Sequence, residues 1–474
     1  MKSCFRRLLL AAALFCLVTD GRVFAQTTNT DLPGWMTRPL SMLDALNVAL
    51  QQNATILKAQ NDLQASYGIV VQTRAVALPQ LSGTGQYKYT QPTAIETLPF
   101  PGFDNANQGW NAGFQLVQNI YDGGRLTAAF RSARLTKEQA LAEYQTKLQD
   151  TLLSTRLAYY DVLLALEQIT VHQASVKLLQ NEVEDQQRRY KAGTVPQFNV
   201  LRAEVQLANE RPLLIRAQNS YRVSKNNLSN LLGYNLPRDV WEDIPMDLTD
   251  TLDATPYPVD LPVAIAQALG SRTELVSLRK ASELQQEGII NAKAGYKPTL
   301  QAFAGYNWFS AQYSVAPNPP VTPGTPPLSL GWIYGGYNVG AQVSWNIFDG
   351  MLTHGKVVQA KANFDKSKND LSDKTRQIEL EVRTSYSDFI EATEVLDSQK
   401  TVLAEAAEAL REAQARFDAG TGTQLDVLDA ETSLTQARDT NALALHDYDA
   451  ARARLERAIG ENMIQPAAAA TSNH

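Results

Sequence analysis

The stretch Asn119-Ile120-Tyr121-Asp122-Gly123 decides the fold, because it returns 227 residues later as Asn346-Ile347-Phe348-Asp349-Gly350. The turn Tyr190-Lys191-Ala192-Gly193-Thr194 returns at the same offset as Phe417-Asp418-Ala419-Gly420-Thr421. Gly233 returns as Gly460. Chance similarity of two helices does not hold one register over more than a hundred residues. The chain therefore contains two copies of one fold.

The earlier parts of the two copies match at a shorter offset. Pro79-Gln80-Leu81 corresponds to Pro298-Thr299-Leu300 at 219, so eight extra residues lie in the second copy. They belong to the Pro-rich insert at 317–327, which we expect to be a surface loop. The organisation that follows is a first repeat, a linker, a second repeat and a C-terminal tail, at residues 26–233, 234–261, 262–460 and 461–474.

The first 25 residues have the three parts of a secretory signal peptide: a basic cluster (Lys2, Arg6, Arg7), an apolar run at 8–18, and the ending Val23-Phe24-Ala25. A membrane-spanning helix needs about 20 apolar residues, and no stretch reaches that length. Both cysteines, Cys4 and Cys16, lie in this segment, so we expect neither a disulfide nor a lipid anchor in the mature chain. Its net charge of −9 offers nucleic acid no basic surface.

Two runs without glycine or proline, from Leu126 to Ala192 and from Lys356 to Ala419, each predict a helical rod of roughly 100 Å. Apolar residues recur along the second run at the spacing of a coiled coil. After each glycine turn the chain returns over about half that length, as at 423–459, and helices at 43–78 and 264–294 would cover the other half. An antiparallel coiled coil in solution would have the same helices, so the helices alone do not identify a function.

The strand patterns distinguish a membrane protein from a coiled coil in solution. Residues 338–347 alternate between apolar and small or polar side chains, as a transmembrane β-barrel strand does. Residues 111–116 and 300–308 alternate likewise, and 81–89 more weakly. Aromatic rings are expected at the strand ends, at the membrane interface (Tyr87, Tyr89, Trp110, Tyr121, Tyr306, Trp308, Tyr337, Trp345). A small soluble sandwich remains an alternative. Four strands cannot close a barrel, so strands in a membrane would require an oligomer.

Two copies of a strand pair plus a long hairpin, with N-[IF]-[YF]-D-G strand ends and R-[YF]-x-A-G-T turns, resemble the TolC-like outer membrane factor family from about Leu43 to Gly460. The resemblance implies an α+β membrane protein. It would be a homotrimer, whose twelve transmembrane strands, four per chain, form one β-barrel on a long periplasmic α-helical coiled-coil tunnel. The linker at 234–261 would lie in the belt around the tunnel.

The same resemblance implies a function and partners. The chain would be the outer-membrane channel subunit of a tripartite efflux or type I secretion system, a passive duct in outer-membrane lipid. A periplasmic adaptor (membrane fusion) protein would open it, and an inner-membrane transporter would supply the power. In the family the hairpin tips face the adaptor, which implies docking residues at Ala192, Gly193, Thr194, Ala419, Gly420 and Thr421. We expect both tip glycines to adopt the left-handed conformation.

Site residues at the channel entrance also follow from the resemblance. Asp426 and Asp429 match a pair of entrance aspartates, and a trimer would arrange them as two acidic rings. They are three residues apart on one helix and therefore share a face. Asp426 has a second interpretation, because Thr423 to Asp426 is also a capping box. Where the family's closing contacts use a Tyr, an Arg and an Asp, this sequence has Phe417, Gly422 and Asn199, so that lock is missing.

Functions of other classes have little support in the sequence. The four histidines (His172, His354, His446, His474) have no metal-ligand spacing, and no phosphate loop or nucleophile elbow is present. We therefore expect no enzyme, no metal and no cofactor. A periplasmic coiled-coil adaptor or scaffold is the remaining alternative, although it does not explain two matched strand pairs. No feature identifies the exported cargo.

Overall fold

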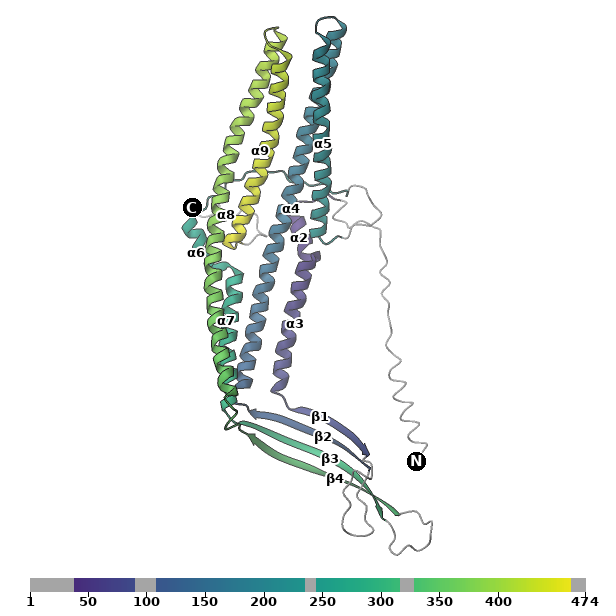
Figure 1. Ribbon diagram of the computed structural model, residues 1–474, viewed down its shortest axis with the longest axis vertical. Helices are drawn as coiled ribbons and strands as arrows, with labels where there is room; N and C mark the ends of the chain where they lie inside the picture. The colour runs from purple at the N-terminus through teal and green to yellow at the C-terminus, as the bar shows by residue number, and fades with distance from the viewer. Residues whose placement is uncertain (1–37, 90–107, 235–243, 316–327, 462–474) are drawn as a thin grey trace. The chain divides into compact units, whose positions relative to one another are not determined.

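The computed structural model describes residues 38–89, 108–234, 244–315 and 328–461 (Figure 1). The expected signal peptide at 1–25, the Pro-rich insert at 317–327 and the tail after residue 461 lie outside the described residues. Leu40 and Pro245–Thr249 belong to a small unit of their own, in which Leu40 forms a parallel β-bridge with Leu248. All the elements below belong to the other unit.

The elements follow the same order in both copies. The first copy has α2 (Met42–Gln52), α3 (Ala54–Val76), β1 (Gln80–Tyr89), β2 (Gln108–Tyr121), α4 (Arg125–Lys191) and α5 (Gln197–Leu231). The second has α6 (Leu261–Ser271), α7 (Thr273–Lys293), the short 3-10 helix η2 (Ala294–Tyr296), β3 (Thr299–Val315), β4 (Leu328–Ser344), α8 (Leu352–Asp418) and α9 (Gln424–Ile459).

The two predicted rods are confirmed. Helices α4 and α8 each have 67 residues, which at 1.5 Å per residue gives roughly 100 Å. Helix α8 begins at Leu352, four residues before the predicted run, and so contains Gly355. Each rod turns back into a shorter helix, α5 or α9, and the two hairpins are visible in Figure 1.

The repeated strand-to-helix motif owes its form to its aspartate and glycine. The Asp122 carboxylate accepts a hydrogen bond from the backbone N–H of Leu126 at 3.0 Å, at the start of α4. Asp349 does the same for Thr353 at 2.9 Å, at the start of α8. Gly123 has φ +74°, and a Cβ there would lie 2.7 Å from a backbone oxygen. The motif thus ends a strand and caps a rod at one point.

The helices expected at 43–78 and 264–294 are not continuous, which corrects the sequence-based prediction. The first breaks at Asn53, between α2 and α3. The Asn53 side chain accepts hydrogen bonds from the first N–H groups of α3 and donates one to the carbonyl of Leu231, at 2.7 Å. Helix α5 ends there, so one asparagine caps the start of α3 and the end of α5.

The second break, at Arg272, lies 219 residues later. It also binds the end of the returning helix, but through a guanidinium and a hydroxyl in place of an amide. The Arg272 guanidinium donates to the carbonyl of Ala458 at 3.0 Å, near the end of α9. The Ser271 hydroxyl donates to the carbonyl of Ile459 at 2.9 Å. In each copy, therefore, the outer helix breaks where the returning helix ends.

The sheet is antiparallel with the order β1-β2-β3-β4, and its register confirms the predicted alternation up to Ser344, where β4 ends three residues before the predicted end at 347. One face carries apolar rows across all four strands, Leu81-Leu116-Ala304-Val339 and Gly83-Phe114-Tyr306-Tyr337. The other face carries rows such as Ser82-Gln115-Gly305-Asn338. Val339 is 73% exposed and Tyr337 83% exposed, so no described residue of this chain covers the apolar face there.

The expected place of the aromatic residues is only partly right. Tyr121 ends β2 and Tyr89 ends β1, but Tyr306, Trp308 and Tyr337 lie well inside β3 and β4. The Tyr306 and Trp308 side chains pack over Gly335, since a Cβ there would lie 2.9 Å from the Trp308 ring and 2.9 Å from the Tyr306 hydroxyl. A glycine at this position therefore makes room for aromatic rings on the sheet.

Candidate functional site

Both hairpin tips end their rods in the same way. Gly193 has φ +77° and Gly420 has φ +75°, which confirms the expected left-handed conformation. The N–H of Thr194 donates to the carbonyl of Arg189 at 3.0 Å, and that of Thr421 to Arg416 at 2.9 Å. These bonds satisfy carbonyls that the end of a helix leaves free. All six tip residues named above as docking residues are exposed.

Asp426 and Asp429 lie just beyond the second tip, and both are exposed. The predicted capping box is present, because the Asp426 carboxylate accepts from the N–H of Thr423 at 2.9 Å while the Thr423 hydroxyl accepts from Asp426. This backbone hydrogen bond, with the Thr423 side chain, lowers the pKa of Asp426. Within the described part of the chain, the Asp429 carboxylate forms no hydrogen bond or ion pair, so capping accounts for the first aspartate alone.

The three positions of the missing lock lie near the junction of the two hairpins. The ring of Phe417, at the end of α8, faces the Arg189 guanidinium of α4 at 4.8 Å. Arg189 also approaches the Asp418 carboxylate at 3.8 Å. The backbone carbonyl of Asn199 accepts from the Gln424 amide at 3.3 Å. Gly422 packs against the backbone at the end of α8, where a Cβ on it would be 3.0 Å from the Phe417 nitrogen.

Sequence reasoning missed Arg189 and Gln424, which connect the first hairpin to the second. The Gln424 amide donates to the Glu182 carboxylate of α4 at 3.2 Å, besides its bond to Asn199. Arg189 lies directly before the repeated tip turn, in the R-[YF]-x-A-G-T pattern. That pattern recurs in both copies, so it does not show which arginine reaches across.

Helices α4 and α9 run antiparallel along the whole junction of the hairpins, and polar groups line it. We call this contact the seam. Successive hydrogen bonds and ion pairs cross it at Glu182–Gln424, Ser175–Thr435, Gln168–Asp439, Asp161–His446, Arg156–Glu456 and Asp150–Arg457. Most apolar contacts lie within one hairpin, such as Leu410 with Val427 and Leu434, but Leu428 of α9 belongs to an apolar cluster with Val176, Leu179 and Val183 of α4. Polar contacts therefore follow the seam along its length, with an apolar contact across it near the tips.

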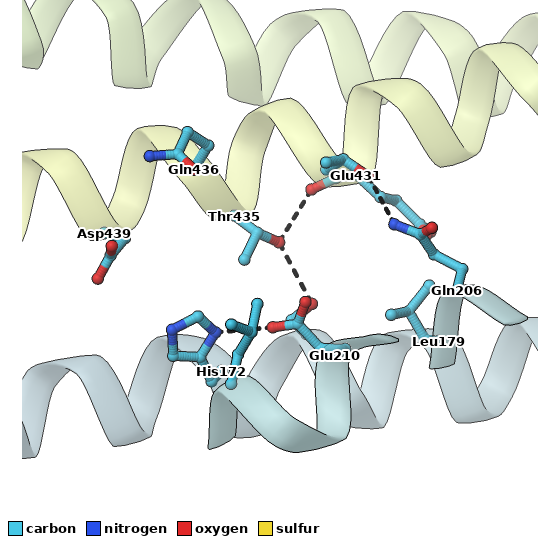
Figure 2. A pocket seen from close by; sticks show the side chains of 11 residues that line it. His172, Leu179, Gln206, Glu210, Glu431, Thr435, Gln436 and Asp439 are labelled. Atoms are coloured by element: carbon cyan, nitrogen blue, oxygen red, sulfur yellow. Dashed lines mark hydrogen bonds and ion pairs between the residues drawn. The ribbon is translucent and has the colours of Figure 1, made fainter. Parts of the chain in front are cut away.

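A pocket opens in the seam below the tips (Figure 2). The cavity has a volume of about 90 Å³, enough for a few water molecules. His172 and Glu210, which are 2.7 Å apart, line one side, and Glu431 and Asp439 of α9 line the other. Glu431 is only 5% exposed, and its Oε2 has no hydrogen-bond partner among the described residues.

Within the described residues, histidines, cysteines and acids form no group of three that could hold a metal ion. His172 pairs with Glu210, and His446 with Asp161 and Asp447. None of the described helices is both long and apolar enough to cross a membrane.

A family model described as "Outer membrane efflux protein" matches residues 45–234 and 264–461, one match for each copy. The chain belongs to the outer membrane efflux protein family. It is 25% identical to the outer membrane protein TolC of Escherichia coli K12, over 89% of this chain and 82% of that protein. It is 24% identical to the cobalt-zinc-cadmium resistance protein CzcC of Cupriavidus metallidurans, over 89% of this chain and 90% of that one.

Solved structures have the same fold as this outer membrane efflux protein. The CusC structure gives a TM-score of 0.71 at 17% identity, covering 92% of this chain and 96% of that one. The outer membrane protein VceC of Vibrio cholerae gives 0.69 at 18% identity, covering 89% and 96%. The predicted family and fold class are confirmed. As a member of this family, the chain is an outer-membrane channel subunit whose helices lie in the periplasm, and not a coiled-coil scaffold.

Proposed function

We propose that this outer membrane efflux protein works as a passive homotrimeric duct, with no enzymatic activity of its own. The described part of each chain offers four strands in one sheet, whose outer edges must be paired in lipid. Three copies would pair them in a twelve-stranded barrel. The exposed apolar rows of the sheet support this, because they suit contact with outer-membrane lipid. Its relative TolC is described as an outer membrane protein, which agrees with the same placement.

Asp426 and Asp429 are the residues that we assign to the channel entrance. Both carboxylates are exposed in a single chain, and nothing in the described part of that chain uses the second one. Threefold symmetry would place six carboxylates around the opening, where like charges attract cations and repel anions. Phe417, Gly422 and Asn199 form the gate region beside them, where Arg189 of α4 contacts both Phe417 and Asp418. The observation that supports this assignment of the entrance is the exposed carboxylate of Asp429, which has no capping role.

Replacing both aspartates, Asp426→Asn with Asp429→Asn, is expected to abolish most of the cation preference of single channels in planar bilayers. An asparagine at 426 still accepts from the Thr423 N–H, so the capping is retained while the charge is lost. Reversal potentials in a salt gradient measure the change. Asp373→Asn, an exposed acid on α8 paired with Arg376, is the matched control. An unchanged reversal potential in the double variant, at normal conductance, would show that selectivity is set elsewhere.

The hairpin tips are the proposed docking surface for a periplasmic adaptor, which in turn would contact an inner-membrane transporter. Relatives include the alkaline protease secretion protein AprF of Pseudomonas aeruginosa, 24% identical over 88% of this chain and 83% of that one. Both CzcC and AprF resemble this chain about equally, so the cargo is not assigned. The six tip residues support docking because they are exposed and rigidly held by the glycine turns.

Gly420→Val is expected to reduce export in the native host while the trimer level stays normal. A valine at φ +75° strains the backbone by roughly 1–3 kcal/mol, but it meets no other atom within 4 Å. The tip should therefore distort without a loss of the fold. Gly350→Val is the control, since Gly350 also has a positive φ, +64°, with open space at its Cβ position, and lies at the other end of α8. Normal export by Gly420→Val would mean that the glycine only forms the turn and has no role in docking.

A further inference from the structure

Glu431 differs from the other buried charged groups that cross the seam. Arg156 and Glu456 pair with each other, and Arg457 pairs with Asp150. Among the described residues, the Glu431 carboxyl has no such cation. The amide groups of Gln186 and Gln424, which lie toward the tip, both donate to the Glu182 carboxylate. A buried carboxylate without a cation or a donor is costly, whereas a neutral carboxyl is tolerated.

The unpartnered atoms around this part of the seam are all acceptors. Gln186 Oε1, Gln424 Oε1 and Glu431 Oε2 are buried and have no hydrogen-bond partner among the described residues. Gln186 is fully buried, and Gln424 is 5% exposed. Buried acceptors without protein donors need hydrogens from another source, and water in the adjoining pocket lined by Glu431 can supply them. A proton on the Glu431 carboxyl removes its charge and turns one of its oxygens into a donor.

We propose that Glu431 is a proton-controlled latch between the two hairpins, which lets α9 close against α4 when it is neutral and drives the seam open when it is ionised. The latch acts within one chain and does not depend on the acidic entrance rings. Among the described groups, the arrangement favours a proton over a metal ion, because no three acids or histidines there converge on a metal site.

The charged groups that face Glu431 reinforce this direction. Helix α4 contributes Glu182 and His172, and α5 contributes Glu210, which is 2.7 Å from His172. Helix α9 itself contributes Asp439. Helix α8 packs on the other side of α9 and contributes no charged side chain to the pocket lining. Because His172 already pairs with Glu210, an ionised Glu431 would face a net negative surface.

The pKa of Glu431 defines the pH window. Burial in the seam, and then the Glu182 carboxylate, raise this pKa to about 7 from its ordinary value of 4.5. In a separated seam the carboxyl would be solvated and would ionise near its ordinary pKa. Closing therefore takes up a proton between about pH 4.5 and 7, and the closed seam weakens as pH rises through that window. Above pH 7 the carboxyl is ionised in both the closed and the separated seam, so a further rise in pH changes nothing more. Ionisation has by then lowered the equilibrium constant for closing by roughly two orders of magnitude.

A cysteine at Ser175 can report the state of the seam. Ser175 is 8% exposed and its hydroxyl accepts from Thr435 at 3.3 Å, one helical turn from Glu431. Residues 26–474 contain no cysteine, so Ser175→Cys provides a single thiol in a chain without residues 1–25. The rate of its modification by an uncharged methanethiosulfonate reagent, in the purified assembly of such chains, follows the open fraction. The ionisation of the thiol affects the rate equally in the wild-type and Glu431→Gln backgrounds, so its effect cancels when the two rates are compared at the same pH.

At pH 7.5 the wild-type background should react at least tenfold faster than Glu431→Gln, and the two rates should converge at pH 5. Glu182→Gln should reduce the difference at pH 7.5. The matched control is Asp449→Asn, a second acid of α9 that is 6% exposed and whose pKa is raised to about 6 by burial. It lies five turns from Glu431 and should leave the pH dependence intact.

A rate ratio that stays constant from pH 5 to 7.5 would overturn the latch. An equal flattening by Asp449→Asn would also overturn it, because the effect would then be general to buried acids. Millimolar Ca²⁺ at pH 7.5 should leave the wild-type rate unchanged. A fall to the Glu431→Gln rate would mean that a bound cation, and not a proton, closes the seam.

Discussion

Replacing Gly233 with valine is expected to leave little folded protein, whereas the same substitution at Gly193 should cost only about 1–3 kcal/mol. Both glycines end a rod or its return helix with the same hydrogen bonds and nearly the same φ, +80° and +77°. Their surroundings differ. A Cβ at Gly233 would lie 2.4 Å from the carbonyl oxygen of Gln52 and 2.9 Å from its carbon, but Gly193 has open space.

The difference follows from the end-on contact of α5 with α2. Both variants have the same strain at a left-handed φ. The additional loss of unfolding free energy in Gly233→Val, roughly 2 kcal/mol or more, therefore comes from the collision of its side chain with the backbone of Gln52. Guanidinium unfolding followed by circular dichroism, with purified yield as a second measure, makes the comparison. Equal midpoints for the two variants would contradict the packing of α2 against the end of α5.

Glu274→Gln is expected to destabilise the protein by roughly 3 kcal/mol, because it breaks a buried network of charges. The Glu274 carboxylate accepts from Arg272 at 2.9 Å and from Arg457 at 2.7 Å. These guanidiniums are 3% and 5% exposed, respectively. Glu381 of α8 and Asp150 of α4 complete the network, so it connects four helices. Neutralising the shared carboxylate leaves buried positive charge without its nearest compensation.

The same variant should change the acid sensitivity of the fold. Burial alone would raise the pKa of Glu274, but the Arg272 hydrogen bond and the charge of Arg457 lower it to about 2, from 4.5. A lowered folded-state pKa means that this stability is present above pH 4.5 and is lost as pH falls from 4.5 to 2. Unfolding midpoints should therefore fall less steeply across that range in Glu274→Gln. Glu408→Gln, at an exposed pair with Arg411, should behave like the wild type.

Much of the fold could be predicted because it is encoded by residues close together in the sequence. The Asn119 motif and its copy gave the repeat, and the absence of glycine and proline gave the two rods. Alternation at 338–347 gave a two-faced sheet. The breaks at Asn53 and Arg272 could not be predicted in this way. Neither residue breaks a helix by itself, and each break depends on the end of another helix that only the folded chain brings there.

The candidate site was predictable only where a turn or a cap defines it. The tip glycines and the capping box of Asp426 have local sequence signals. Arg189 looks like any arginine on a solvated rod, and its contact with Phe417 depends on which hairpins lie together. Glu431 did leave a signal, because Gln424 and Glu431 are seven residues apart on one helical face, with Val427 buried between them. Polar residues at such core positions mark a place where another helix must provide the environment.

The pairing of β2 with β3 also sets the order in which the chain can be built. Each of the two outer strand pairs forms between neighbouring segments, but β2 meets β3 through residues about 180 to 200 positions apart, which is a long loop to close. Contacts of such large sequence separation form late in folding. The lipid-facing surface is therefore incomplete until β4, which ends at Ser344, has been synthesised and exported. A chain exported only to the end of the first repeat has no finished surface for a bilayer, so insertion must wait for the two strands of the second repeat.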